Sequence, residues 1–283
     1  MTDFHRLYEG KGLNLEVINT FQFLISSYYE RFGRDFPFRK DLTPYNILVS
    51  EIMLQQTQTS TVSEKFLNFI KLFPDFEALA NAPTDRVLEA WQGLGYNRRA
   101  LALKNIAEKV INEFDGRLPD KVEELKKLPQ IGHNTASSII TFAFNKATYF
   151  VETNIRRVFI YFFFHKRKSI SDKEILPLVK ATVDKKNPRR WYYALMDYGV
   201  MLKKTHPELN KRSAHYRKQK PFKGSNREIR GKILKILLKK KVLEKSELYS
   251  YLKYPQHRIN KILGELEKEG FLSIINEKIQ VAD

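Results

Sequence analysis

The sequence predicts a mainly α-helical protein in two parts, a large all-helical region followed by a small α+β domain. Apolar residues recur at helical spacing from about residue 15 to residue 202, with Gly, Pro and Asn breaks between short segments. A strand-like pattern appears only after about residue 270. Between these regions the composition changes at Lys203, where a run rich in Lys and Arg begins. A chain of 283 residues is long enough for two or three such domains.

The composition indicates a folded protein with a polyanionic partner. Lys and Arg outnumber Asp and Glu by 50 to 32, a net charge of +18, and hydrophobic residues make up 42% of the chain. The absence of cysteine excludes disulfides, Cys-ligated zinc and iron–sulfur clusters. No apolar run has the length of a membrane span, and the first ten residues lack the apolar core of a signal peptide. We therefore expect a monomeric cytoplasmic protein, or a nuclear one if the host has a nucleus.

The first predicted helix covers residues 15–32 and is expected to be largely buried, because eight of its side chains between Val17 and Tyr29 are large and apolar. Breaks at Gly33 and Pro37 follow. Thr43 then caps a second helix that has Pro44 at its first position.

Glu51 is the unusual residue of this second helix, because it lies among apolar neighbours. A buried carboxylate is costly unless it is paired or protonated. Desolvation raises a carboxyl pKa, which suits a general acid. The alternative is a structural glutamate that is held by an arginine such as Arg39.

Short helices follow in quick succession, joined by short loops. The pattern places them at residues 62–72, 76–80, 86–91, 100–114, 121–128, 155–164, 173–184 and 191–202. The tight turn GLGYNRRA, residues 93–100, puts Tyr96 beside Arg98 and Arg99. Such a tyrosine either wedges into a duplex while the arginines hold phosphates, or caps a core.

Residues 123–144 read as two helices joined by a tight turn, a helix-hairpin-helix. Pro129 stops the first helix, Gly132 permits the reversal, and the second helix resumes at Asn134. Unpaired backbone N–H groups at the start of that second helix would bind a DNA phosphate. An ordinary turn between two helices is the alternative. Glu152 lies shortly afterwards, just before a helix that begins near Thr153.

The C-terminal part reads as a basic linker, residues 203–226, and a small domain, residues 227–283. The linker is either a solvated tether or an arm that follows phosphates. In the small domain we expect helices at residues 228–239 and 255–269, a short helix capped by Ser246, and a hairpin that turns at Asn276 and Glu277. Three helices followed by a hairpin indicate a winged helix, which binds either DNA or a protein partner. The candidate DNA contacts on its third helix are His257, Arg258 and Lys261.

The segments LVSEIMLQQTQ, AWQGLGYNRRAL, LPQIGHNTASSI and VETNIRRV, in this order, resemble the helix-hairpin-helix DNA glycosylase superfamily, and most closely its adenine glycosylase, MutY-like branch. The resemblance covers about residues 30–202. It implies a two-lobed fold, with a six-helix domain at about 45–145 and a second lobe from 1–44 and 146–202. The linker and winged helix are similar to the C-terminal part of some shorter bacterial adenine glycosylases.

The resemblance implies a monofunctional base excision repair enzyme that binds double-stranded DNA, flips an adenine lying opposite 8-oxoguanine or G, and hydrolyses its N-glycosidic bond. Glu51 would protonate the adenine, Glu152 would stabilise the oxocarbenium-like sugar, and Asn154 would lie beside that sugar. The helix terminus at Glu152 favours its ionised form, so the two carboxyl pKa values should be pushed apart. The other implied site residues are Arg39, Leu54 and Asp197 in the base pocket, Gln56, Thr57, Leu94 and Tyr96 at the opposite base or wedge, and Gly132, Asn134 and Thr135 at the hairpin phosphate.

Four residues depart from the family pattern. Glu152 stands where Asp is usual, which adds about 1.3 Å of reach at a site that tolerates about 0.5 Å. Asn134 replaces the Lys of the endonuclease III branch, so we expect no Schiff base and no efficient strand cleavage. Lys203 replaces the first cluster cysteine, and Gln130 replaces the first Gly of the hairpin.

The resemblance also suggests a monovalent cation at the hairpin and no other cofactor. No segment after residue 220 resembles the 8-oxoguanine-reading domain of longer adenine glycosylases. Two alternatives stay open at this point. They are a mismatch thymine or uracil glycosylase of the same superfamily, and a catalytically inactive DNA-binding paralogue.

Overall fold

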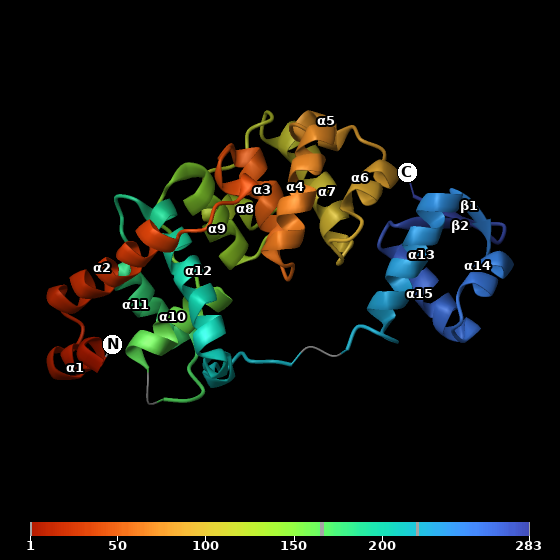
Figure 1. Ribbon diagram of the computed structural model, residues 1–283. Helices are drawn as coiled ribbons and strands as arrows, with labels where there is room; N and C mark the ends of the chain where they lie inside the picture. Colours follow the sequence, from red (N-terminus) through yellow and green to blue (C-terminus); the bar gives the residue numbers. More distant parts are fainter. Residues whose placement is uncertain (1, 165–166, 219–220, 283) are drawn as a thin grey trace. The chain divides into compact units, whose positions relative to one another are not determined.

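The structure, a computed structural model, describes residues 2–164, 167–218 and 221–282 and confirms a mainly helical protein with one small sheet (Figure 1). Its chain forms two compact units. Unit 1 comprises Met1–Ile47, Asp120–Lys127 and Ile131–Lys218, and unit 2 comprises Leu48–Pro119, Leu128–Gln130 and Gln219–Asp283.

Unit 1 is a cluster of helices around an aromatic core. Its elements are α1 (Thr2–Lys11), α2 (Leu15–Phe32), η1 (Pro37–Arg39), α8 (Val122–Leu125), α9 (His133–Phe144), α10 (Thr153–Phe163), α11 (Asp172–Thr182), α12 (Pro188–Thr205) and η2 (Pro207–Arg212). Helix α12 packs against both α10 and α2. Phe21 of α2 lies at the centre, with its ring 5.0 Å from that of Phe162 and 5.7 Å from that of Trp191. Edge-to-face contacts of this kind stabilise aromatic cores.

Helix α2 begins and ends as predicted, but it is not largely buried. Only Val17, Phe21 and Ile25 are fully buried, whereas Phe23 is 69% exposed. These three residues are spaced by four, so they form a single narrow stripe on one helix face. The number of apolar residues therefore overestimated the burial of this helix.

Unit 1 also takes up the first half of the predicted basic linker. Helix α12 continues to Thr205, and η2 buries Leu209. The backbone of Ile170 pairs with the segment around Ser213 through hydrogen bonds from Ile170 N to Arg212 O and from Ala214 N to Ile170 O, both 2.9 Å long. The chain up to residue 214 is thus ordered against α10 and the turn before α11. Residues 219–220, which belong to the same predicted linker, lie outside the described part.

Helix α3 (Pro44–Leu54) begins in unit 1 and continues into unit 2. The predicted cap is confirmed, because Asn46 N donates to Thr43 Oγ1 at 3.2 Å. In unit 2 follow α4 (Thr59–Leu72), α5 (Phe76–Ala80), α6 (Thr84–Trp91) and α7 (Arg98–Glu113). Trp91 and Phe69 meet edge to face at 5.8 Å in the core of these helices.

The C-terminal region contains α13 (Asn226–Lys240), β1 (Val242–Glu244), α14 (Lys245–Tyr251), α15 (Gln256–Lys268), β2 (Leu272–Ile275) and β3 (Lys278–Val281). The strands form one antiparallel sheet in the order β1-β3-β2. The predicted hairpin is present, with φ angles of 49° at Asn276 and 64° at Glu277, as a two-residue turn requires. Two details differ from expectation. Glu244, not Ser246, caps α14, and strand β1 was not expected because three residues are too few to show alternation.

One close approach fixes α12 against the start of α10. Gly199 lies in α12, and a Cβ atom there would come within 2.4 Å of Asn154 O and 2.8 Å of Asn154 C. These are backbone atoms that cannot move away as a flexible side chain can. Only glycine therefore allows α12 to pack this closely on the segment that carries Asn154.

We predict that Gly199→Ala destabilises the protein by about 1–3 kcal/mol, because the added methyl overpacks a backbone contact. Thermal and urea unfolding would measure the loss. Gly231→Ala in α13 is the matched control, since no described atom lies within 4 Å of the position that its added methyl would take and an open helical site should gain roughly 0.5–1 kcal/mol. Equal effects of both substitutions would contradict the proposed close packing.

Candidate active site

Glu51 lies on α3 between buried neighbours. Ser50 and Ile52 are 2% and 1% exposed, whereas Glu51 keeps an intermediate exposure. Asn46 and Ser50, the other polar residues before Glu51 on this helix, are both buried. Glu51 as a residue is consequently less buried than the sequence suggested, although most of its helix is buried.

The loop after α3 lies beside the loop before α7. Thr57 Oγ1 donates to Leu94 O at 3.3 Å, so two of the predicted opposite-base residues are brought together. Gln56 and Tyr96 are exposed, and Tyr96 retains 39% of its accessible surface. Leu94, by contrast, is 4% exposed. Of the four predicted opposite-base or wedge residues, Gln56 and Tyr96 are therefore exposed, whereas Leu94 is buried.

Arg98 and Arg99 behave differently, although the sequence suggested that both hold phosphates. Arg98 is exposed and forms an ion pair with Glu269 at 2.5 Å. Arg99 is 4% exposed and donates to backbone carbonyls of the two loops and of α3. The expectation of a phosphate contact is wrong for Arg99, because its guanidinium is buried and donates its hydrogen bonds to groups of the protein itself.

Asp197, a predicted base-pocket residue, is buried at the centre of a hydrogen-bond network in unit 1. Arg39 donates to both carboxylate oxygens at 2.9 and 3.0 Å, and Arg34 donates through its backbone N–H at 2.7 Å and its side chain at 2.6 and 2.9 Å. Burial alone would raise the pKa of Asp197, but the hydrogen bonds from Arg39 and Arg34 outweigh it and hold the pKa below its usual range. The Arg39 guanidinium also lies over the Tyr193 ring, 4.3 Å from its centre. Both Nη atoms of Arg39 thus donate to Asp197.

Glu152 caps α10 with its own carboxylate. Oε1 accepts hydrogen bonds from the backbone N–H groups of Asn154 at 2.8 Å and Ile155 at 3.0 Å. Burial raises the pKa of this carboxyl, and the two N–H donors together with Arg157 and Arg156 oppose that rise without cancelling it. The expectation that the helix terminus would dominate is therefore wrong in direction, because the cost of desolvation exceeds the effect of the helix end.

Asn154 is oriented by a buried arginine that the sequence analysis did not single out. Arg157 is 2% exposed and donates to Asn154 Oδ1 at 2.8 Å, to Asn210 Oδ1 at 3.1 Å and to Gly199 O. The signal available in the sequence was the spacing of three between Asn154 and Arg157, which puts both on one helix face. Arg34, five residues before Arg39, was likewise not predicted as a site residue, although it donates to Asp197.

The hairpin turn keeps the geometry that glycine would favour. Gln130 adopts a left-handed φ of 57°, and Gly132 is the N-cap of α9. Asn134 Nδ2 donates to Val151 O at 2.9 Å, so its side chain binds the backbone of the residue just before Glu152. The phosphate contacts of Gly132, Asn134 and Thr135, and the monovalent cation, stay predictions.

Metal-binding clusters and membrane-spanning helices are both absent from the described residues. No group of three or more His, Asp or Glu side chains within residues 2–164, 167–218 and 221–282 is placed to hold a metal ion. In the same part of the chain, the helices are too short or too polar to cross a membrane.

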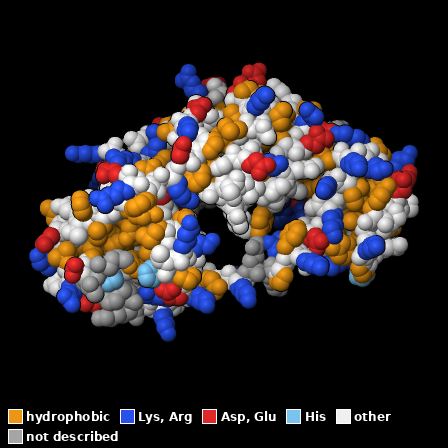
Figure 2. All heavy atoms as spheres, in the orientation of Figure 1, with side chains coloured by type: hydrophobic (Ala, Val, Ile, Leu, Met, Phe, Trp, Pro, Cys, Tyr) orange, Lys and Arg blue, Asp and Glu red, His pale blue; other side chains and the backbone are white. Residues whose placement is uncertain are grey.

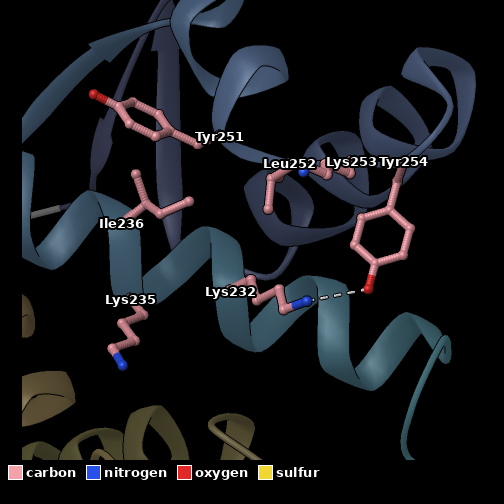
Figure 3. A pocket seen from close by; sticks show the side chains of 7 residues that line it. All are labelled: Lys232, Lys235, Ile236, Tyr251, Leu252, Lys253 and Tyr254. Carbon is pink, nitrogen blue, oxygen red and sulfur yellow. Dashed lines mark hydrogen bonds between the residues drawn. The ribbon is translucent and has the colours of Figure 1, made fainter.

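The C-terminal region has a basic hollow of about 410 Å³ beside α13 (Figure 3). Lys232 and Lys235 line it from α13, and Lys253 and Tyr254 from the turn before α15. Lys232 Nζ donates to the Tyr254 hydroxyl at 3.2 Å. Of the predicted contacts on α15, Arg258 binds Asn226 Oδ1 and Gly224 O, while His257 and Lys261 are exposed.

We predict that Asp197→Asn lowers the free energy of unfolding at pH 7 by about 3 kcal/mol, because the buried carboxylate is the counterion of two partly buried arginines, Arg34 and Arg39. A depressed carboxyl pKa contributes stability that is present above the unfolded value of about 3.9 and is lost as the pH falls through the folded pKa. Urea unfolding should therefore show the difference from wild type shrinking below about pH 4.

The matched control is Asp120→Asn, whose partner Lys146 is half exposed, and it should change stability little at either pH. A wild-type advantage over Asp197→Asn that stays constant down to pH 3 would contradict the pKa direction assigned to Asp197.

Comparison with known proteins identifies the region that holds most of these residues. Residues 49–182 match the family described as HhH-GPD superfamily base excision DNA repair protein. The chain is 36% identical over 192 residues to an adenine DNA glycosylase of Buchnera aphidicola, covering 66% of this chain and 54% of that protein. It is 39% identical over 133 residues to one of Mycobacterium tuberculosis, covering 47% and 44%.

A solved thermostable thymine-DNA glycosylase has the same fold, with a TM-score of 0.61 and 26% identity over 70% of this chain and 96% of that one. The chain spans about half the length of the curated relatives it matches. These similarities show that residues 49–182 are an HhH-GPD domain, the domain of a superfamily of base excision DNA repair proteins, and that proteins named adenine DNA glycosylase are among the relatives of this chain.

Proposed function

We propose that this protein is a monofunctional DNA N-glycosylase that removes mispaired adenine from double-stranded DNA. The observation that carries the proposal is Glu51, a partly exposed glutamate on the largely buried helix α3, within the region that is similar to proteins named adenine DNA glycosylase. The next loops present the exposed Gln56 and Tyr96 on the same unit.

In the proposed reaction the adenine leaves the base stack, because its glycosidic bond cannot be reached inside a duplex. Glu51 donates a proton to adenine N7, which turns the base into a competent leaving group, and the C1′–N9 bond breaks. Glu152 faces the positive charge that develops on the sugar and takes a proton from the attacking water. A carboxylate whose pKa is raised by burial is a stronger base than an ordinary one.

Asn154 is proposed to bind the reacting sugar. Its side chain is held by Arg157 and by its contact with Glu152, where Asn154 Nδ2 lies 3.4 Å from Oε2. A side chain fixed by its neighbours is positioned before the substrate arrives, which lowers the barrier to reaction. Arg39, Leu54 and Asp197 are proposed to line the base pocket.

The proposed enzyme hydrolyses the base without cleaving the strand efficiently. Strand cleavage of the endonuclease III type needs an amine that forms a Schiff base with C1′. Asn134 stands at that position, and its amide is not a nucleophile and already donates to Val151 O. Hydrolysis alone is the chemistry left to this set of residues.

DNA binding is proposed to involve both the hairpin and the basic C-terminal region, which we assign as a winged helix. Lys and Arg side chains are spread over the visible face of the molecule instead of forming a single tail (Figure 2). The net charge of +18 favours a polyanion, and binding should weaken with salt as counterions are released. Gly132 at the start of α9 is the proposed phosphate anchor, with Tyr96 as the proposed wedge.

The second candidate is a mismatch glycosylase that removes thymine opposite G. The similarity to a thymine-DNA glycosylase over 96% of that chain favours it, since this comparison spans nearly a whole protein. A third, an inactive DNA-binding paralogue, is favoured by Glu152 in the place of Asp. The substrate therefore has to be decided by assay.

We predict that the protein releases adenine from duplexes with A opposite 8-oxoguanine or G and leaves T opposite G intact. A base-release assay over all mispairs, with alkaline cleavage of the product, measures this directly. The matched control is Glu51→Gln, which should lower the rate by at least about 100-fold through loss of the acid, while duplex binding stays unchanged. Release of thymine but not adenine would select the second candidate. Tight binding of the duplex without release of any base would select the third candidate.

We predict that Glu152→Asp retains or raises the rate of base release, since Asp is the usual residue at this position in the family. Asp also remains a good N-cap for α10, so the helix should not be destabilised. Single-turnover kinetics would test this, with Glu152→Gln as the control that keeps the length but removes the charge. A Glu152→Asp variant that folds and is inactive, beside an active wild type, would contradict the assigned role.

A further inference from the structure

Arg99, in the first turn of α7, joins three separate segments of unit 2 through one buried guanidinium. Nη1 donates to Ile52 O and Met53 O, both at 2.8 Å, and to Gln55 O at 2.6 Å. Nη2 donates to Thr57 Oγ1 at 3.0 Å, to Leu94 O at 3.0 Å and to Gly95 O at 2.9 Å. The acceptors belong to the end of α3, the loop that follows it and the loop before α7.

The contacts explain how a charge is kept in the core. Carbonyls at the C-terminal end of a helix have no partner within the helix and carry partial negative charge. Burial lowers the pKa of Arg99 to about 10, so the guanidinium stays charged at neutral pH. In the described part of the chain, Arg99 forms no ion pair with an Asp or Glu, and carbonyl dipoles balance its charge instead.

Backbone geometry at the two exposed loop residues supports a role beyond packing. Gln56 has a φ of 54° and Tyr96 a φ of 49°, a left-handed conformation that L-residues seldom adopt. Arg99 holds the carbonyl of the preceding residue in each case, Gln55 O and Gly95 O. Strained residues persist only where the surroundings hold them, and they cluster at functional sites.

We propose that Arg99 is a positioning residue that sets the opposite base-reading loops against the helix of Glu51, so that recognition of the opposite base controls the rate of base excision. This rests on the proposed glycosylase function. Arg99 acts through Gln56, Thr57 and Tyr96 and does not itself touch DNA, because it is 4% exposed. An arginine that merely stabilised the fold would lower all rates alike.

The test compares wild type with Arg99→Lys, in which one ammonium cannot serve six acceptors in a planar fork. Single-turnover base release is measured for adenine opposite each possible base, and affinity is measured on a duplex with an uncleavable adenine analogue. For Arg99→Lys, release from the preferred pair should fall about 100-fold. Release from poor pairs should fall much less, so that discrimination shrinks while affinity stays within about threefold.

The matched control is Arg189→Lys in unit 1. Arg189 likewise donates to carbonyls at the end of a helix, Phe142 O at 2.7 Å and Ala143 O at 3.0 Å in α9. Its substitution should leave the discrimination between opposite bases unchanged even where it lowers the melting temperature. The comparison of the two variants separates the general effect of losing an arginine at a helix end from the specific effect of losing Arg99.

A second variant keeps the proposal testable if Arg99→Lys does not fold. Thr57→Val leaves the guanidinium in place and removes the hydroxyl that accepts from it, so discrimination should fall by at least about threefold. Folded Arg99→Lys with wild-type discrimination would overturn the proposal, as would unchanged discrimination in Thr57→Val if only that variant folds. A wild-type protein that releases no base from any mispair overturns the proposed function instead.

Discussion

The hydrogen bonds of Arg99 are the interaction on which the candidate site in unit 2 depends. Short helices joined by tight loops leave many backbone carbonyls without partners in the interior, and each such group is costly unless it is satisfied. One guanidinium satisfies five of them at a point where three segments meet. Because its donors are fixed in a plane, the arginine also fixes the directions of the segments it joins. Glu51 and the loop that carries Tyr96 are held by the same group for this reason.

In unit 1 a different buried arginine, Arg157, binds polar groups of three segments in a similar way. Arg157 binds the carbonyl of Gly199 and the side chains of Asn154 and Asn210, and thereby connects α10, α12 and η2. The absence of a side chain at Gly199 lets α12 lie against the backbone of Asn154. Glu152 and Asn154 are thus supported from the core side by groups that would not touch a substrate, as a precise site requires. In both units the residues proposed for catalysis rest on buried arginines that carry no catalytic role of their own.

The sequence predicted the order and type of most elements, and their ends within a few residues, because periodicity and capping are local properties. α5 and the Thr43 cap are examples. It failed where the outcome depends on tertiary contacts. Helix α2 buries a narrower stripe of residues than its number of apolar residues suggests. The 3-10 helix η2 packs within unit 1, although its sequence reads as a basic linker. Arg98 and Arg99 are adjacent and identical in the sequence, yet only the second falls on the face of α7 that also buries Leu103 and Ile106. The spacing of four and seven residues from those apolar side chains is the signal in the sequence that indicates the burial of Arg99.

Departures from the family pattern need not mean loss of the geometry that the pattern encodes. Gln130 replaces a glycine and still adopts φ of 57°, a conformation that costs an L-residue about 1–2 kcal/mol. Its side chain offsets part of that cost, because Nε2 donates to Arg98 O at 3.0 Å. Glu152 replaces an aspartate and still caps α10, with one oxygen accepting from two backbone N–H groups. Among the described residues, capping leaves Oε2 with a single long contact, to Asn154, so this second oxygen is available for chemistry. In the proposed reaction one oxygen of Glu152 keeps the structural role of cap and the other acts on water, and this division of roles would make a glutamate at position 152 compatible with catalysis.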